Sequence, residues 1–327
     1  MSYAPFVVLP GLMVLVGVAP SGGLVGGPDP AGIVGGDEVP EGEHPEVVEL
    51  SVAHDGGTAL CTGTLLTPSL VLTAAHCFDH DGVDPASVSV ARPQDSDPTF
   101  ADDLEVHPDY CRVSTDHHCE FMAAHRHDLN DFAWVHLAES LAIDDANLPT
   151  FITDQARYHD TLHTGATVTL LGFGRDEQGN RGTLREVEAT VGSFSPDGLD
   201  FHIDATGGHD ACKGDSGGPA LIERDDGTWA LAGVLSRGPS ECGTEEQSSI
   251  YGVPLPVLHW VSEASGQDVL PTACADEPWD VAPCLDITPG PDDDTDRLDC
   301  AVHDPRDRSL AGPLLLCLLL LSRRRQG

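Results

Sequence analysis

The stretch Cys212-Lys213-Gly214-Asp215-Ser216-Gly217-Gly218-Pro219 determines how the rest of this 327-residue chain is interpreted. It places a serine between an aspartate and a pair of glycines, a setting in which the backbone can turn tightly and aim two N–H groups at one point. Such a point is suited to holding an oxyanion. The stretch therefore predicts that Ser216 is a nucleophile beside an oxyanion-binding site.

Two further blocks supply the groups that a serine nucleophile needs. Leu72-Thr73-Ala74-Ala75-His76-Cys77 contains a histidine and Asn130-Asp131-Phe132-Ala133 an aspartate, so a base, a carboxylate and a nucleophile follow in the order His, Asp, Ser. With Ile33-Val34-Gly35-Gly36, these blocks resemble the trypsin/chymotrypsin family of serine endopeptidases, from Ile33 to about Ser265. The alternative, an inert turn and a core histidine, does not account for four blocks in the family's order.

The resemblance implies a role for each of these residues. His76 would take a proton from Ser216, and Asp131 would hold the imidazole in the required tautomer. The N–H groups of Gly214 and Ser216 would form the oxyanion hole. Ser236 matches a family position that hydrogen-bonds the aspartate. We expect hydrolysis of protein or peptide substrates. The alternatives are a catalytically silent relative that binds a partner, and an adhesin, which only the C-terminal tail suggests.

The resemblance also places a substrate pocket. Counting back from Ser216, Asp210 occupies the position at the floor of the primary pocket in trypsin-like members, where a carboxylate pairs with a substrate Arg or Lys. Gly238 would keep one wall open. Ser249 stands on the opposite wall, where relatives that cleave after Arg usually have glycine. We therefore expect cleavage after Arg or Lys through a narrowed pocket; the alternative is a solvated loop aspartate that selects nothing.

Arg237 departs from the family, which usually has tryptophan between the positions of Ser236 and Gly238. The tryptophan forms an apolar wall beside the bound peptide, and an arginine replaces that wall with a charge. We hypothesise a preference for acidic residues near the scissile bond. A tolerated surface arginine is the alternative.

The block that begins at Ile33 predicts activation by cleavage. In the family, a cut before this block frees an ammonium that enters the protein and pairs with the aspartate preceding the nucleophile, here Asp215. A buried carboxylate without that partner is costly, so the uncut chain should be poorly organised there. The cut would follow Gly32, where relatives activated by tryptic cleavage carry Arg or Lys. We therefore expect an activating protease of another specificity.

The overall charge is strongly negative. The formal net charge is -38, and Lys213 is the only lysine. Such a surface repels nucleic acid and anionic membranes, so nucleic acid is not an expected partner. We interpret the charge as a solubility device; the alternative is binding of cationic substrates or divalent metal. The family resemblance implies no cofactor.

The ten cysteines favour an oxidising compartment. The resemblance implies two disulfides, one that brackets the histidine segment and one that brackets the nucleophile loop. Close spacing suggests two more. The four pairs are Cys61–Cys77 and Cys212–Cys242 from the resemblance, and Cys111–Cys119 and Cys274–Cys284 from spacing. Cys300 and Cys317 have no obvious partners.

Many short apolar or alternating segments, broken by Gly, Pro or Asp, predict strands with few helices. They are Val47–Val52, Ala59–Leu66, Leu70–Ala74, Phe132–Leu137, Thr167–Phe173, Glu186–Val191, Ala220–Ile222 and Trp229–Leu235. This pattern indicates an all-β sandwich or barrel. The resemblance implies two packed six-stranded antiparallel β-barrels, with the site at their seam. Helical spacing of Val257, Leu258 and Val261 predicts a short C-terminal helix.

The chain divides by composition into five segments. We expect a signal peptide at 1–22, a propeptide at 23–32, the trypsin-like domain at 33–266, an acidic, proline-rich spacer at 267–308 and an apolar tail at 309–327. The signal peptide rests on the apolar run from Phe6 to Val18, for which a buried helix is the alternative.

The tail consists of Cys300, a spacer, the apolar run Leu310–Leu321 and three arginines from Arg323 to Arg325. It resembles the C-terminal sorting tails of myxobacterial surface proteins. A simple membrane tail is the alternative, although the apolar run is shorter than the roughly 20 residues that span a bilayer. Either interpretation predicts a secreted protein that the cell surface retains.

Two segments suggest metal binding. Asp79-His80-Asp81-Gly82-Val83-Asp84 places oxygen ligands at alternating positions around a glycine, as calcium loops do, but lacks the distal glutamate of an EF-hand. A second segment carries four histidines that could bind zinc. They are His117, His118, His125 and His127. An exposed polar loop is the favoured alternative for it, and we assign no metal ligand.

Overall fold

The computed structural model describes Ile33 and residues 36–110, 130–152, 161–174, 182–195, 198–204, 206, 209–238 and 248–271. The chain divides into two units, Met1–Gly290 and Pro291–Gly327, and every described residue belongs to the first. The predicted signal peptide, propeptide and C-terminal tail lie outside the described residues, as does the predicted spacer beyond residue 271.

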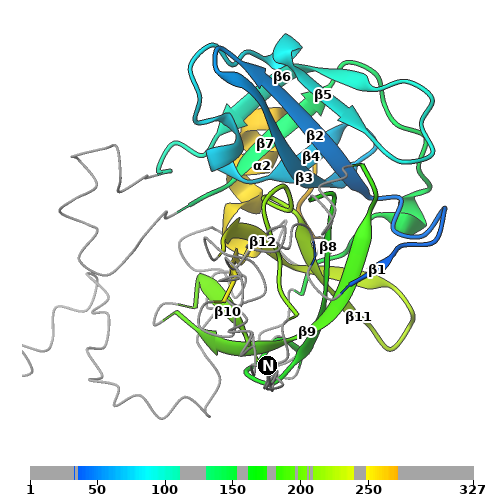
Figure 1. Ribbon diagram of the computed structural model, residues 1–327, viewed down its shortest axis with the longest axis vertical. Coiled ribbons are helices and arrows are strands. Elements are labelled where there is room, and N and C mark those ends of the chain that lie inside the picture. Colours follow the sequence, from blue (N-terminus) through cyan, green and yellow to red (C-terminus); the bar gives the residue numbers. More distant parts are fainter. Residues whose placement is uncertain are drawn as a thin grey trace, which may run out of the picture. The chain divides into compact units, whose positions relative to one another are not determined.

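The first barrel is a closed antiparallel sheet in the order β2-β3-β4-β7-β6-β5 (Figure 1). Its strands are β2 (Val47–His54), β3 (Gly57–Thr67), β4 (Leu70–Thr73), β5 (Val88–Ala91), β6 (Thr99–Val106) and β7 (Ala133–Leu137). Alternate side chains of a strand point to the same face, and Val48, Leu50 and Val52 of β2 accordingly pack together in the barrel core.

The second barrel has the strand order β9-β10-β13-β12-β11-β8 and closes because β8 also pairs with β9. Its strands are β8 (Thr167–Gly172), β9 (Arg185–Phe194), β10 (Asp200–Asp204), β11 (Pro219–Glu223), β12 (Trp229–Arg237) and β13 (Ile250–Gly252). The short strand β1 (Asp37–Glu38) adds to β9. On β9 the buried side chains alternate again, at Val187, Ala189 and Val191.

The helices of the described residues are short. Four are 3-10 helices: η1 (Ala75–Phe78), η2 (Pro85–Ser87), η3 (Asp145–Asn147) and η4 (Leu255–Val257). The α-helix α2 (Leu258–Ser265) follows η4, where helical spacing predicts it, and ends at Gly266 in the left-handed conformation. Among these residues, no helix is long and apolar enough to cross a membrane.

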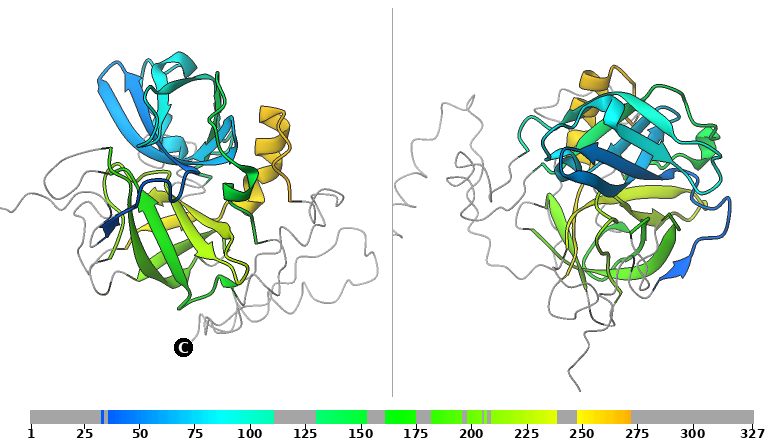
Figure 2. Two further views of the ribbon diagram at one scale, coloured as in Figure 1. Left: turned by 90° about the vertical axis from the view of Figure 1, so that its right-hand side faces the viewer. Right: turned by 45° about the horizontal axis from the view of Figure 1, so that its top comes forward.

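Helix α2 returns from the second barrel to the first (Figure 2). Its Trp260 indole donates to the Glu105 carboxylate of β6 at 3.2 Å, and its ring lies edge-on to His107. Its Leu258 and Val261 side chains are buried in the hydrophobic core. The C-terminal helix therefore holds the two barrels together by packing.

The junction of the barrels is a continuous hydrophobic core. Leu70 and Leu72 of β4, Phe132, and Trp134 of β7 belong to the same buried cluster as the inward residues of the second barrel. The predicted fold of two six-stranded antiparallel barrels with a short C-terminal helix is confirmed. The described structure also contains strands that the sequence patterns do not predict: β1, β5, β6, β10 and β13.

Candidate active site

The predicted nucleophile, Ser216, lies in a tight turn just before β11. Gly214 and Gly217 take positive φ values of 102° and 79°, a region that favours glycine. A Cβ atom on Gly217 would also lie 2.5 Å from the carbonyl oxygen of Thr62. The glycines therefore let the turn approach the first barrel closely.

Some backbone N–H groups of this turn donate hydrogen bonds within the protein and others do not. Those of Asp215, Gly217 and Gly218 donate to the carbonyl oxygens of Cys212, Leu235 and Asp215 at 3.1, 2.8 and 2.7 Å. Within the described part of the chain, the N–H groups of Gly214 and Ser216 have no acceptor. These are the two donors predicted for the oxyanion hole. Both are therefore available to an oxygen atom of a bound molecule.

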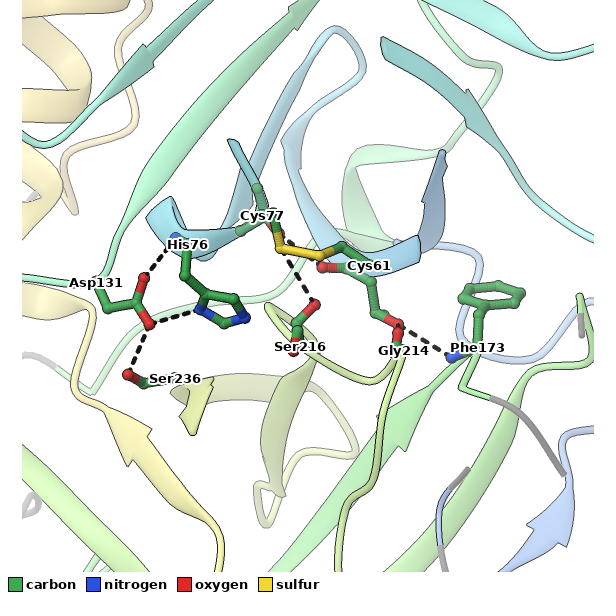
Figure 3. Close-up of a disulfide and its surroundings, with 10 residues drawn as sticks. Cys61, His76, Cys77, Asp131, Phe173, Gly214, Ser216 and Ser236 are labelled. Carbon is green, nitrogen blue, oxygen red and sulfur yellow. Dashed lines mark hydrogen bonds and ion pairs between the residues drawn. A yellow bond between two sulfur atoms is a disulfide. The ribbon is translucent and has the colours of Figure 1, made fainter. Parts of the chain in front are cut away.

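His76 and Asp131 lie beside the ends of two adjoining strands of the first barrel. His76 lies in η1, just after β4, and Asp131 precedes β7, with which β4 pairs at Thr73 and Ala133. His76 Nδ1 lies 2.8 Å from Asp131 Oδ2, and the His76 backbone N–H donates to Oδ1 at 2.9 Å. Figure 3 shows the imidazole between Asp131 and Ser216, with its other nitrogen on the Ser216 side. The structure thus brings the three predicted residues together.

The carboxylate of Asp131 is buried and firmly held. It follows Asn130, which has a positive φ of 53°, a conformation that asparagine tolerates. The Ser236 hydroxyl donates to Asp131 Oδ2 at 2.7 Å (Figure 3). Asp131 is 4% exposed, so its charge is satisfied by these contacts and by His76 rather than by bulk water.

Thr62 of β3 fixes the turn from the side of the first barrel, a role that no sequence motif predicts. Its N–H donates to the Ser216 carbonyl at 2.8 Å, and its hydroxyl donates to the Gly214 carbonyl at 3.0 Å. The same hydroxyl accepts from the Phe173 N–H of the second barrel at 3.0 Å. One fully buried threonine therefore links both barrels to the nucleophile turn.

Asp215 is a fully buried carboxylate beside the nucleophile. It accepts hydrogen bonds from the N–H groups of Gly174 and Cys212, both at 2.8 Å. Cβ atoms on Gly172 and Gly174 would each lie within 2.6 Å of its side chain, so these glycines make room for it. Burial raises the pKa of Asp215 to about 6, with a smaller contribution from the charge of Asp210.

Ile33 and Gly36, the two described residues of the predicted activation block, lie next to each other, and Gly36 adjoins Glu186 of β9. The Ile33 side chain is buried in the core, and a Cβ atom on Gly36 would lie 2.7 Å from it. The Arg185 guanidinium donates to the Gly36 carbonyl oxygen. Arg185 also faces Gly172 across the β8–β9 pair, and Gly172 contacts the Asp215 side chain. Ile33 and Asp215 are therefore linked through neighbouring contacts in the uncut chain.

The predicted pocket residues also lie together. Asp210 is 1% exposed and accepts from the Ala211 N–H at 2.8 Å and from the Ser249 N–H at 3.2 and 3.3 Å. Burial raises the pKa of Asp210, against the effect of these hydrogen bonds. The Ser249 hydroxyl is buried beside Asp210 and faces Gly238, where a Cβ atom would lie 3.0 Å from the hydroxyl oxygen. Ser249 therefore narrows this site.

Arg237, at the end of β12, points to partners within the protein. Its Nη2 lies 3.2 Å from Asp200 Oδ2, and its Nη1 donates to the Ser236 hydroxyl at 3.1 Å. The Arg237 side chain is 23% exposed. Burial lowers the pKa of the neighbouring His202, and the charge of Arg237 lowers it further. The guanidinium therefore has a carboxylate partner already.

One predicted disulfide is seen complete. Cys61 of β3 and Cys77 of η1 are joined, with their Cα atoms 6.3 Å apart (Figure 3). This bond ties the segment that carries His76 to the first barrel. Cys212 is also disulfide-bonded, while its predicted partner Cys242 lies outside the described residues. The two pairs suggested by spacing lie outside them too: Cys111–Cys119 and Cys274–Cys284.

The two predicted metal sites stay predictions. In the calcium-like segment, Asp84 caps η2 by accepting from the Ser87 N–H at 3.2 Å. Among the described residues, the one group with converging metal-ligand atoms is Cys61, His76 and Cys77, and its two sulfur atoms form the disulfide. The segment with the four histidines lies outside the described residues.

Two closed antiparallel barrels that meet beside a histidine, an aspartate and a serine define the two-barrel, chymotrypsin-like class of proteins. The sequence profile of the Trypsin family matches residues 33–261, which include every residue of the site. The chain belongs to the Trypsin family.

Curated relatives agree with this assignment. The chain is 28% identical to the proclotting enzyme of Tachypleus tridentatus, over 71% of this chain and 65% of the relative. It is 25% identical to melanization protease 1 of Drosophila melanogaster, over 70% and 64%. It is 28% identical to human mannan-binding lectin serine protease 1, over 72% and 36%. The chain thus spans less than two thirds of the length of each relative.

Proposed function

We propose that the chain is a trypsin-like serine endopeptidase in which Ser216, His76 and Asp131 form the catalytic triad. One observation carries this proposal. The His76 imidazole lies between Ser216 and the Asp131 carboxylate, with Nδ1 2.8 Å from Asp131 Oδ2. The backbone N–H groups of Gly214 and Ser216 have no acceptor among the described residues. A base, its orienting carboxylate, a nucleophile and an oxyanion site are the set that acyl transfer needs.

The reaction follows from these contacts. Asp131 accepts the Nδ1 proton of His76, so the other ring nitrogen carries no proton and can act as a base. That nitrogen takes the hydroxyl proton as Ser216 Oγ bonds to the peptide carbonyl carbon, and the N–H groups of Gly214 and Ser216 hold the resulting oxyanion. The imidazolium then gives the proton to the leaving amine, and the acyl-enzyme forms. Water, activated by His76, releases the acid and restores Ser216.

Cleavage after Arg or Lys is the specificity that the pocket supports. Asp210 is nearly fully buried, and no cation pairs with it within the described residues. A substrate guanidinium or ammonium would supply the missing charge. The buried hydroxyl of Ser249, beside the Asp210 carboxylate, offers the substrate a further polar contact in a narrowed pocket. A preference for upstream acidic residues is a second specificity hypothesis, which concerns Arg237.

Cleavage after Gly32 would activate the enzyme. The new ammonium of Ile33 would pair with Asp215, whose buried carboxylate has hydrogen bonds but, in the described part of the chain, no ion pair. The contacts that join Gly36, Arg185 and Gly172 to Asp215 support this route. Because Gly32 does not suit a pocket for basic residues, another protease would make the cut.

The segments around the domain suggest where the enzyme acts. We propose export through residues 1–22, removal of residues 23–32, and retention at the cell surface through residues 309–327 beyond the spacer 267–308. The disulfide between Cys61 and Cys77 supports an oxidising compartment. Proteins or peptides outside the cell would be the substrates.

The proposal is tested with the full chain cut after Gly32 by a protease whose site is engineered there. Peptides in which Arg, Lys, Phe or Ala directly precedes the scissile amide bond are incubated with wild type, Ser216→Ala and Ser96→Ala. The exposed Ser96 hydroxyl, which contacts Asp97, serves as the matched control. We expect cleavage by wild type and Ser96→Ala, and loss of at least about 1,000-fold in Ser216→Ala. Equal, negligible rates in all three would favour the catalytically silent binding protein.

A further inference from the structure

A chain of hydrogen bonds connects Arg237 with the proposed catalytic aspartate. Arg237 Nη1 donates to Ser236 Oγ at 3.1 Å, and Ser236 Oγ donates to Asp131 Oδ2 at 2.7 Å. The same Oδ2 atom lies 2.8 Å from His76 Nδ1. Arg237 thus lies two hydrogen bonds from the carboxylate that holds the proposed general base.

The donor and acceptor groups determine which atom donates in each of these hydrogen bonds. A guanidinium carries only N–H donors, so the Ser236 oxygen must accept from it. A serine hydroxyl has a single hydrogen, and its oxygen is already engaged with Arg237. That hydrogen is therefore committed to Asp131. Without Arg237 the hydroxyl could rotate to another acceptor, and the carboxylate would lose a firmly placed donor.

Asp200 holds the guanidinium in place from across the sheet. Arg237 lies on β12 and Asp200 on β10, with β13 between them. The Nη2 atom of Arg237 reaches Asp200 Oδ2 at 3.2 Å while Nη1 serves Ser236. Gly252, the β13 residue opposite Asp200, carries no side chain, and a Cβ atom there would lie 3.7 Å from Asp200 Oδ1. The arginine is therefore bound at two nitrogens, which restricts its rotamer.

We propose that Arg237 is a positioning residue, which orients the Ser236 hydroxyl and through it the Asp131 carboxylate, with Asp200 as its anchor. The inference rests on the proposed function, because it concerns the same His76–Asp131 pair. It gives Arg237 a role inside the site in addition to any contact with a substrate.

The charge of Arg237 also acts on the site. Among the described residues, the titratable groups around it are Asp200 and His202 from β10, and Asp131 with His76 from the first barrel. A cation near this pair disfavours the protonated imidazole. Removing the cation should therefore shift the acid limb of the rate profile to higher pH.

The test compares variants of the full chain after cleavage before Ile33. Arg237→Gln removes the charge and is too short to reach both partners. We expect kcat to fall about tenfold, equivalent to one charge-assisted hydrogen bond, with KM little changed. We also expect the acid limb of kcat/KM to rise by roughly half a pH unit. Arg224→Gln, which removes a charge that contacts Thr150, is the matched control and should match wild type in both.

Two further variants keep the test decisive if Arg237→Gln folds poorly. Arg237→Lys retains the charge but bonds one partner at a time, so it should keep the wild-type acid limb and lose part of kcat. In a Ser236→Ala background, Arg237→Lys should change kcat less than twofold, roughly the limit of additivity for uncoupled sites, because the link is already broken. An equal fall of kcat in both backgrounds would overturn the proposal.

Substrate profiles separate the inference from its competitors. Peptides with Glu or Ala upstream of the cut are compared for wild type and Arg237→Gln. A KM rise confined to the Glu peptides, with kcat and the acid limb unchanged, would show that Arg237 binds substrate and would overturn the positioning role. A wild type that cleaves no peptide would instead refute the proposed function itself.

Discussion

At the scale of single residues, the site is characterised by three buried aspartate carboxylates. Asp131, Asp210 and Asp215 are each at most 4% exposed, yet their surroundings differ. Asp131 contacts a histidine, whereas Asp210 and Asp215 accept backbone N–H groups and form no ion pair among the described residues. This is consistent with the proposal that Asp210 binds a cation of the substrate and Asp215 the ammonium of a new N-terminus.

The Asp215 carboxylate predicts how the stability of the uncut chain depends on pH. Its pKa is raised from 3.8 to about 6, so the folded chain binds more protons than the unfolded chain between these values. The free energy of unfolding should therefore fall as the pH rises from about 4 to about 6, by about 3 kcal/mol for two pKa units. Urea unfolding of the uncut Ser216→Ala chain at several pH values measures this.

Asp215→Asn in the same chain should remove that part of the pH dependence, while Asp225→Asn, at an exposed position, should leave it. In the cut enzyme, an ion pair with Ile33 would depress the Asp215 pKa, and the sign would reverse. If the Asp215→Asn substitution left the pH dependence of the uncut chain unchanged, the buried, unpaired carboxylate would be contradicted.

Asp210 predicts a charge-dependent specificity. Asp210→Asn removes the buried charge and nearly preserves the shape, so kcat/KM for Arg and Lys peptides should fall about 100-fold or more. Hydrolysis of a matched Ala peptide should change little, because that side chain does not need the charge. The ratio of the two kcat/KM values is the measurement. A parallel fall for both peptides would mean that Asp210 supports the fold and does not select the substrate.

Single residues differ in how far sequence allowed their prediction. His76, Asp131 and Ser216 stand in distinctive blocks, and the structure brings them together. Thr62 was not predicted, because a threonine within a strand has no local signature. Its three contacts arise only when both barrels are in place. The ion pair of Arg237 was missed for a similar reason, since Asp200 is 37 positions away.

Whether the sequence predicts a strand depends on how much of that strand is buried and on how long it is. β4 and β11 are almost wholly buried, and their continuous apolar runs are recognisable. β6 carries three acidic residues on largely exposed positions, and its pattern looks like a loop. β10 and β13 have only five and three residues, too few for a period to show. Pairing with neighbouring strands, rather than local propensity, forms these three.

At Gly172, the last residue of β8, we expect one added methyl group to lower stability and activity. In Gly172→Ala, the Cβ atom would lie 2.6 Å from Cγ of Asp215, whose side chain is fully buried. Overpacking should destabilise the chain by about 1 to 3 kcal/mol and displace the carboxylate beside Ser216. Thermal unfolding and peptide hydrolysis measure the two effects.

Gly56→Ala is the control for that variant, because its Cβ atom would meet only the tip of the His54 ring, at 3.1 Å. We expect near wild-type stability and activity there. Equal, small changes in both variants would show that the Gly172 site is less tightly packed than the contacts indicate.

For the whole molecule, the packing of two barrels explains why residues distant in sequence form one site. The His76–Asp131 pair belongs to the first barrel and the Ser216 turn to the second, and a shared hydrophobic core holds the barrels together. Strand patterns alone predict an all-β fold but cannot choose between a sandwich and barrels, because both consist of short alternating strands. The resemblance of the motif blocks made that choice, and the structure confirms it.

The most direct test of the account is covalent labelling of the cut, full-length chain with a fluorophosphonate, followed by peptide mapping. If His76 activates Ser216 at the junction of the barrels, one phosphonyl group should be found on Ser216, and His76→Ala should abolish the label in a chain that still folds. An unlabelled Ser216 in the cut, folded chain, or equal labelling of His76→Ala, would contradict the catalytic triad.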